Sequence, residues 1–305
     1  MNHSNVRAAL AVLSAGMLIA AGCSGSGSGA KTGRINLGVS DHPIHDATKV
    51  CIAFTGVEIK PKEGPAIMAT PVMDEVSNIN LLDFQGMNAA PLLMNYELPA
   101  GEVSWIRLAV NAVRGGIGGT GDDPTTTECQ GDESYIAMES TTHNLYIPSG
   151  AQSGLKLHGN IVVPQGGLAD FTVEFDLMKS VASPPGLDPD AVFRPTLRLV
   201  NNAEVGALTG QVSNELVVAE CAPSVYLFED DGMDAALVAA NALTSAMVEE
   251  QMNELEMTEY HYTIGFLLGG DYEIAFSCDD GVTLDPANGK PATVVAGEVT
   301  EVDLP

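Results

Sequence analysis

Alternation of apolar and polar residues with a period of two runs through most of this chain. Ile35–Val39, Phe171–Asp176 and Tyr272–Phe276 show it most clearly. This period places successive side chains on opposite faces of a β-strand. Further strands are expected at Val50–Ile59, Val103–Val110, Leu155–Val163, Phe193–Val200, Leu208–Ser213, Val225–Phe228, Tyr262–Leu267 and Val299–Leu304. Many short strands separated by Gly- and Pro-containing turns predict a mainly β protein built from sandwiches or barrels.

One segment departs from this pattern. Residues 234–255 are rich in Ala, Leu, Met and Glu, and Leu243, Met247 and Val248 lie at helical spacing. Met252 and Leu255 continue that spacing imperfectly, so part of the segment fits a strand as well. The expected fold is mainly β, with two β-sandwich-like domains and one short helix in the second.

The N-terminus has the features of a lipoprotein signal peptide. Arg7 precedes an apolar run that ends in Ala20-Ala21-Gly22, and Cys23 follows. Small residues before a cleavage point suit a signal peptidase, and the cysteine supplies the thiol that the lipoprotein pathway acylates. The apolar run is shorter than the roughly 20 residues that a spanning helix needs. We therefore expect removal of residues 1–22 and lipid on Cys23; an ordinary cleaved signal is the alternative.

The segment after the cysteine has the composition of a linker. Residues 24–33 are mostly Ser and Gly, which predicts a flexible tether. Ser24 is not the Asp that retains many lipoproteins at the inner membrane. For a host with two membranes, this favours attachment to the outer membrane.

The net charge of the chain is strongly negative. With 40 acidic and 13 basic residues, the formal charge is −27 at pH 7. Such a chain repels phosphate backbones and anionic lipid heads, which argues against a nucleic-acid partner. Cations, neutral glycans and other envelope proteins are the expected partners, beside the membrane reached through the lipid on Cys23.

Four of the five cysteines remain if Cys23 carries lipid. An even number in an exported chain indicates disulfides. Four cysteines allow three pairings, and four reduced thiols are the alternative to all of them. Cys51–Cys129 and Cys221–Cys278 is the most economical pairing, because two cysteines lie in the first half and two in the last third.

Motifs spread over residues 34–200 resemble a known bacterial lipoprotein domain. They are Ser40-Asp41-His42-Pro43, Asn80-Leu81-Leu82-Asp83, Leu98-Pro99-Ala100-Gly101, Ile147-Pro148-Ser149-Gly150 and Phe175-Asp176-Leu177-Met178-Lys179-Ser180. Their order and spacing resemble domain of unknown function 4382 (DUF4382). His42 and Val103 depart from the residues typical of that family. The resemblance implies no catalytic residues.

A weaker resemblance covers residues 206–305. It rests on Leu208–Val212 and on the Tyr262–Cys278 region, which has Gly269-Gly270 at its turn. These segments are similar to the carboxypeptidase-regulatory or transthyretin-like β-sandwich.

The sequence features together predict four parts of the chain. They are a signal peptide (1–22), a lipidated cysteine with its tether (23–33), a DUF4382-like domain (34–203) and a transthyretin-like sandwich (204–305).

Two motifs imitate those of enzymes. Residues 116–121 match the letters of a dinucleotide fingerprint, but Asp122, Asp123 and Pro124 follow where a helix should begin. We interpret this segment as a flexible surface loop. Ser153-Gly154-Leu155-Lys156 resembles a penicillin-interacting motif, but the Lys-Thr-Gly that should follow lies before it, at residues 31–33. No enzyme is predicted.

Two further segments invite a metal or a partner. Glu229, Asp230, Asp231 and Asp234 flank Gly232 and supply the oxygen ligands that calcium prefers, although the spacing differs from that of an EF-hand. A solvated acidic turn is the alternative. The sequence Asp41-His42-Pro43-Ile44-His45-Asp46 offers fewer converging groups than a closed zinc site requires. No cofactor other than calcium is expected.

Trp105 is the only tryptophan. Its neighbours Ile106, Leu108 and Val110 are expected to face the core, which places Trp105 on the other face of the strand. There it stacks on a sugar or a partner, or packs against the second domain.

The sequence as a whole therefore predicts a non-enzymatic envelope module with a structural or interaction role. A calcium- or glycan-binding surface protein is the first alternative, and an unrecognised envelope enzyme is the second alternative.

Overall fold

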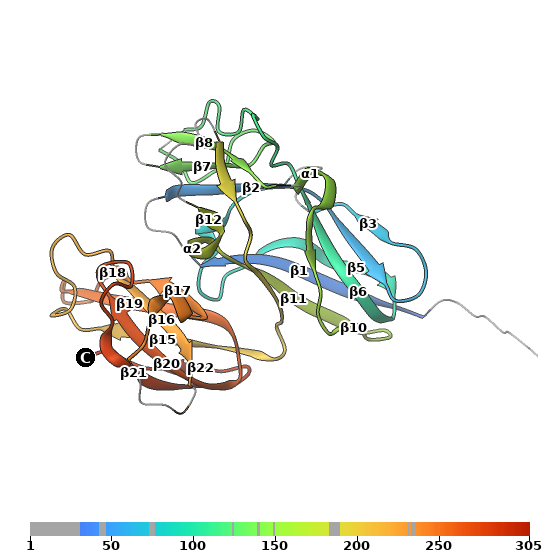
Figure 1. Ribbon diagram of the computed structural model, residues 1–305. Helices are drawn as coiled ribbons and strands as arrows, with labels where there is room; N and C mark the ends of the chain where they lie inside the picture. Colours follow the sequence, from blue (N-terminus) through green and yellow to red (C-terminus); the bar gives the residue numbers. More distant parts are fainter. Residues whose placement is uncertain are drawn as a thin grey trace, which may run out of the picture. The chain divides into compact units, whose positions relative to one another are not determined.

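The structure is a computed structural model. It describes residues 31–42, 47–72, 77–123, 125–138, 141–148, 150–182, 190–230, 232 and 236–305. Lys31–Pro305 form one compact unit, and nearly all of its regular structure is strand (Figure 1). Cys23 lies outside the described residues.

Two sheets account for residues 32–201. The four-stranded sheet has the order β14-β11-β1-β5. The larger sheet has the order β10-β6-β2-β7-β8-β13-β12, with β3 and β4 pairing with β2 and β9 pairing with β6. Their bounds are β1 (Thr32–His42), β2 (Ala47–Pro61), β3 (Ile67–Ala69), β4 (Ser77–Asn80), β5 (Ala90–Pro99), β6 (Gly101–Val110), β7 (Tyr135–Met138), β8 (Thr142–Tyr146), β9 (Leu155–Leu157), β10 (Ile161–Val163), β11 (Leu168–Asp176), β12 (Val181–Ala182), β13 (Asp190–Phe193) and β14 (Leu197–Asn201).

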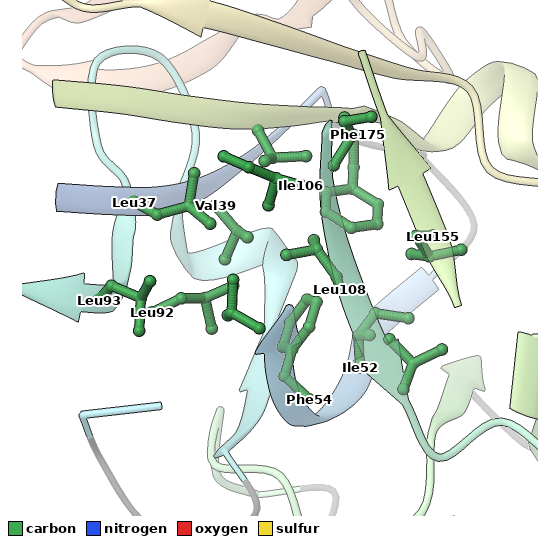
Figure 2. Packing of buried hydrophobic residues seen from close by; sticks show 14 of the residues in the cluster. Leu37, Val39, Ile52, Phe54, Leu92, Leu93, Ile106, Leu108, Leu155 and Phe175 are labelled. Atoms are coloured by element: carbon green, nitrogen blue, oxygen red, sulfur yellow. The ribbon is translucent and has the colours of Figure 1, made fainter. Parts of the chain in front are cut away.

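Apolar side chains from both sheets form one core. Leu37 and Val39 of β1, Phe54 of β2, Leu108 of β6 and Phe175 of β11 belong to it, and all five are fully buried (Figure 2). The rings of Phe54 and Phe175 meet edge to face with centroids 6.1 Å apart. The period-two pattern of β1 and β6 therefore predicts correctly which side chains are buried here, whereas residues Val50–Phe54 of β2 are buried consecutively.

Two further four-stranded sheets account for residues 205–301. Their orders are β18-β19-β15-β22 and β17-β16-β20-β21, and a second apolar core draws on both. Their bounds are β15 (Val205–Val212), β16 (Ser224–Glu229), β17 (Thr244–Met247), β18 (Glu249–Met252), β19 (Thr258–Leu268), β20 (Gly270–Ser277), β21 (Asp285–Val294) and β22 (Val299–Glu301). The predicted fold class, mainly β with sandwich-like packing, is confirmed.

The helix expected within residues 234–255 is wrong. The described part of that segment holds one 3-10 turn, η2 (Ala239–Asn241), followed by strands β17 and β18. β17 pairs with β16, and Thr244, Ser245 and Ala246 are all buried. Pairing with a neighbouring strand overrides the helical preference of Ala and Met, because that preference is worth only tenths of a kcal/mol per residue.

Two expected strands are interrupted. Leu155–Val163 divides into β9 and β10, with Gly159 between them, and Phe193–Val200 divides into β13 and β14 around Pro195. Proline lacks the N–H that a strand ladder requires, which accounts for the second break. The remaining helical turns are η1 (Leu81–Asp83), α1 (Gly150–Ser153) and α2 (Leu177–Ser180). In the described ranges, no helix has both the length and the apolar character to span a bilayer.

Candidate functional site

Trp105 lies on the outer face of the larger sheet. In β6, Val103, Ile106 and Leu108 are buried, whereas Trp105 and Arg107 are only partly buried. This confirms that Trp105 sits on the face opposite the core. The alternation of residues in the sequence alone predicted this position. The register shift between β2 and β6 near Lys60 does not move Trp105 to the core face.

Cations surround the Trp105 ring. The Lys156 ammonium lies 4.3 Å from the ring centroid, and the Arg107 guanidinium carbon lies 5.9 Å from it. Both distances are within the range of cation–π attraction. Lys60 is directly opposite Trp105 on β2. The side chain predicted to contact a sugar or partner therefore lies beside three cations, of which Arg107 is ion-paired with Glu58.

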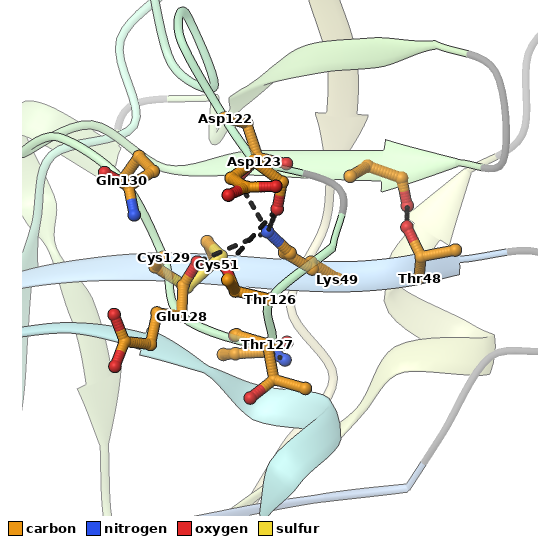
Figure 3. Close-up of polar contacts among 12 residues, drawn as sticks. Thr48, Lys49, Cys51, Asp122, Asp123, Thr126, Thr127, Glu128, Cys129 and Gln130 are labelled. Atoms are coloured by element: carbon orange, nitrogen blue, oxygen red, sulfur yellow. Dashed lines mark hydrogen bonds and ion pairs between the residues drawn. A yellow bond between two sulfur atoms is a disulfide. The ribbon is translucent and has the colours of Figure 1, made fainter.

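A buried lysine lies at the centre of an enclosed polar cluster. Lys49 of β2 donates to Asp122 Oδ1 at 2.9 Å, to the Asp123 carbonyl at 2.6 Å and to the Glu128 carbonyl at 3.3 Å (Figure 3). The Lys49 side chain is 1% exposed and that of Asp122 is 5% exposed. Such a pair holds the segment before β7 against β2, since separating the charges leaves one of them buried alone.

Tyr135 completes this cluster. Its hydroxyl donates to Asp122 Oδ1 at 2.5 Å and accepts from the Gln130 backbone N–H at 3.0 Å. Burial and the hydrogen bond to Asp122 raise the pKa of Tyr135 above its ordinary range. The hydroxyl therefore stays protonated and serves as a donor, not as a general base.

The glycine-rich segment before Asp122 packs closely on β7 and β8. A Cβ at Gly118 would lie 2.4 Å from the Ser134 carbonyl oxygen, and one at Gly116 would lie 2.5 Å from Asn144 Oδ1. These glycines permit close approach of the backbone, which larger residues would prevent. Residues 116–121 lie at the surface, as expected, and their glycines have a packing role.

Both cysteine pairs lie at disulfide distance. The S–S distance is 1.97 Å for Cys51–Cys129 and 1.86 Å for Cys221–Cys278. This is the pairing that the distribution of cysteines favoured. Cys51 is fully buried, and Cys129 follows Glu128, whose carbonyl accepts from Lys49. The first pair therefore fastens the same segment as the buried lysine.

The acidic candidates lie partly outside the described residues. Glu229 ends β16, and Asp230 Oδ1 accepts from the Gly232 backbone N–H at 2.8 Å. Asp231 and Asp234 are not described, so calcium binding at this turn stays a prediction. Of the segment 41–46, Asp41 is buried at the end of β1, and 43–46 lie outside the described residues. Among the described residues, no group of three or more His, Cys, Asp and Glu side chains is placed to hold a metal.

Glu174 of β11 is a buried carboxyl that the sequence did not single out. It is 2% exposed and forms an ion pair with Arg198, directly opposite it on β14. Burial raises the pKa of Glu174 to about 7, and the Arg198 charge only partly opposes this. Alternation predicted Thr172 and Glu174 on a polar face, but β11 lies between β1 and β14 and both of its faces are buried.

The raised pKa of Glu174 makes stability depend on pH. The folded state holds this proton more tightly than the unfolded chain, so the stabilisation is complete below about pH 4.5 and is lost as pH rises through about 7. We expect the stability of Glu174→Gln relative to the unmodified protein to increase by roughly 3 kcal/mol between pH 4.5 and pH 8. Urea denaturation at the two pH values measures this difference, and an equal difference at both would contradict it.

Two of the family-like motifs have clear structural roles. In Asn80-Leu81-Leu82-Asp83, the Asn80 Oδ1 accepts from the backbone N–H groups of Val50 and Leu82, and its Nδ2 donates to Asp83 Oδ1. Asn80 thereby caps η1 and ties it to β2. In the second motif, Asp176 Oδ1 accepts from the Lys179 N–H at 3.0 Å and caps α2. These polar residues satisfy backbone donors at helix starts.

The comparisons with solved structures give only distant likenesses. A Bacillus anthracis protein named TIE has 10% identity and a TM-score of 0.18, with 89% of this chain and 34% of that chain covered. This chain thus spans about a third of its length. The minor pilin GBS52 of Streptococcus agalactiae has 10% identity and a TM-score of 0.20, with 88% and 94% covered. At these TM-scores the likenesses carry no argument about fold or function.

The family comparison is more specific. No curated protein matches the chain. The model of the family described as a domain of unknown function (DUF4382) matches residues 32–195, which is more than half of the 305 residues. This range spans the motifs that carried the resemblance, from β1 to the proline before β14. The chain belongs to the DUF4382 family.

Proposed function

We propose that this protein is a lipid-anchored module of the cell envelope that acts by binding and by its structure, not by catalysis. The observation that carries the proposal is the pair of cysteine bridges, Cys51–Cys129 and Cys221–Cys278, both at bonding distance. Disulfides persist in oxidising compartments outside the cytoplasm and are rare within it. They fit a chain whose first residues have the pattern of an export signal.

The anchor in this proposal is Cys23. It follows Ala20-Ala21-Gly22, and the Ser- and Gly-rich residues 24–33 lead to β1. A linker of that composition lets a folded unit stand away from a membrane to which its N-terminus is attached. Ser24 favours the outer membrane, on its periplasmic or its surface face.

The folded part divides, in this proposal, into two domains at residues 203 and 204. Separate apolar cores on either side of that point support the division. We further propose that residues 204–305 form a carboxypeptidase-regulatory or transthyretin-like sandwich, supported by two four-stranded sheets that share one apolar core, with β19 in one sheet and β20 in the other. In this proposal the partner of the folded part is a protein or glycan of the envelope.

Fractionation of cells tests the anchor. The unmodified protein is expected in the membrane fraction, and Cys23→Ala is expected in the soluble fraction, because removal of the thiol removes the site of acylation. The double variant Cys221→Ala/Cys278→Ala serves as the control for loss of cysteines in general and should stay with the membrane. Recovery of Cys23→Ala in the membrane fraction would exclude this cysteine as the anchor.

A further inference from the structure

Three of the 13 Lys and Arg residues of this acidic chain lie together on one face of the larger sheet, beside Glu58 of β2. Trp105 and Arg107 of β6, Lys60 of β2 and Lys156 of β9 are joined by strand register, since Lys60 is opposite Trp105 and Arg107 is opposite Lys156. Residues directly opposite each other in an antiparallel pair point to the same side of the sheet. We call these four residues, with the exposed Met68 of β3 and Val162 of β10, the Trp105 face.

Two of these cations have no carboxylate partner among the described residues. Lys60 donates to the Pro61 and Gly64 carbonyls at 3.0 and 2.5 Å, and Lys156 lies over the Trp105 ring. Arg107, in contrast, forms an ion pair with Glu58. The uncompensated charges of Lys60 and Lys156 therefore attract an anionic partner to this face.

Exposed apolar side chains accompany the cations. Met68 is 61% exposed and Val162 is 47% exposed. Val162 is opposite Glu102, which lies three residues before Trp105 in β6, and Met68 is opposite Glu58. Tryptophan, lysine and short apolar side chains together are typical of surfaces at the boundary between water and lipid, where the ring and the lysine stems are buried and the ammonium groups meet headgroups.

The chain enters the fold next to this face. The Lys31 carbonyl accepts from the Ala100 N–H at 2.8 Å, immediately before β6 begins at Gly101. The backbone at Gly33 also lies against Val163, the neighbour of Val162. The eight residue-to-residue steps from Cys23 to Lys31 span at most about 28 Å when fully extended, so a lipid on Cys23 keeps this end of the fold close to the bilayer.

We propose that the Trp105 face docks onto the anionic lipid surface to which the chain is anchored. The position of the anchor rests on the proposed function, whereas the affinity of the face for anionic lipid does not. The net charge of −27 does not prevent docking, because exposed charges are screened beyond about 8 Å at physiological ionic strength.

Intrinsic fluorescence tests the proposal, because Trp105 is the only tryptophan. Residues 31–305, the compact unit without the anchor, are mixed with vesicles of phosphatidylcholine and phosphatidylglycerol or of phosphatidylcholine alone. We expect a blue shift of the emission with the anionic vesicles only, and quenching when their acyl chains are brominated. No shift even at low ionic strength, where the attraction is strongest, would overturn the proposal.

A charge-reversal variant locates the contact. Lys60→Glu/Lys156→Glu is expected to weaken vesicle binding at least about 30-fold, since each cation near an anionic surface contributes about fivefold in affinity. Arg194→Glu/Lys290→Glu makes the same change of charge away from the face and should bind as the unmodified protein does. Equal weakening in both variants would show a general charge effect and contradict the assignment.

Two other outcomes are informative. A shift produced by a soluble acidic polysaccharide and not by vesicles would overturn the lipid assignment in favour of a glycan. Failure of Cys23→Ala to leave the membrane fraction would refute the anchor but leave vesicle binding by residues 31–305 unchanged. The two proposals are therefore separately falsifiable.

Discussion

Replacement of Lys49 by methionine is expected to lower the free energy of unfolding by about 3–5 kcal/mol. The variant keeps most of the side-chain volume but leaves the Asp122 carboxylate, with its side chain 5% exposed, without its cation. It also removes the donor to the Asp123 and Glu128 carbonyls. Urea denaturation followed by circular dichroism measures the loss.

An exposed pair provides the matched control. Lys62 and Glu102 form an ion pair at 2.5 Å with side chains 65% and 60% exposed, so Lys62→Met should lower the free energy of unfolding far less than Lys49→Met does. The double variant Lys49→Met/Asp122→Asn should recover part of the loss, because no buried charge remains. Similar costs for Lys49→Met and Lys62→Met would contradict the importance of burial for this pair.

Loss of the Cys51–Cys129 bridge should destabilise the protein by about 4 kcal/mol on the chain-entropy estimate. The bridge closes a loop with a sequence separation of 78, so the unfolded chain gains considerable freedom when the bridge is absent. The effect should appear in Cys51→Ala/Cys129→Ala as a lower melting temperature, measured by circular dichroism.

Reductant provides the control for this second prediction. The unmodified protein should lose stability when reduced, because both bridges open. Cys51→Ala/Cys129→Ala should respond less, because only Cys221–Cys278 remains to be reduced. Equal melting temperatures for the oxidised unmodified protein and the double variant would mean that the first bridge adds no stability.

The strands of the fold were largely predictable because one face of each meets a core. Leu37 and Val39 alternate with polar or small residues, and both are buried as that pattern predicts. The pattern fails where a strand is covered on both faces, as at Glu174, since alternation gives no sign of a second contact. It also fails in β17, where pairing with β16 decides the conformation.

The candidate sites were predictable to different degrees. Strand alternation was enough to place Trp105 on the outer face, but the cations around its ring come from β9 as well as β6, and only strand pairing unites them. The contact between Lys49 and Asp122 joins residues 73 apart, which no local pattern encodes. A signal was nevertheless present: Lys49 directly precedes the apolar run Val50–Phe54 in the same strand, where a charge requires a buried partner.

The most direct test of the envelope assignment is incorporation of a fatty-acid probe into the full-length protein. The unmodified protein should become labelled, and mass spectrometry should place the lipid on an N-terminal peptide that begins at Cys23. Cys23→Ala should take up no label. Label on Cys23→Ala, or an N-terminal peptide that begins at Cys23 without lipid, would contradict the account.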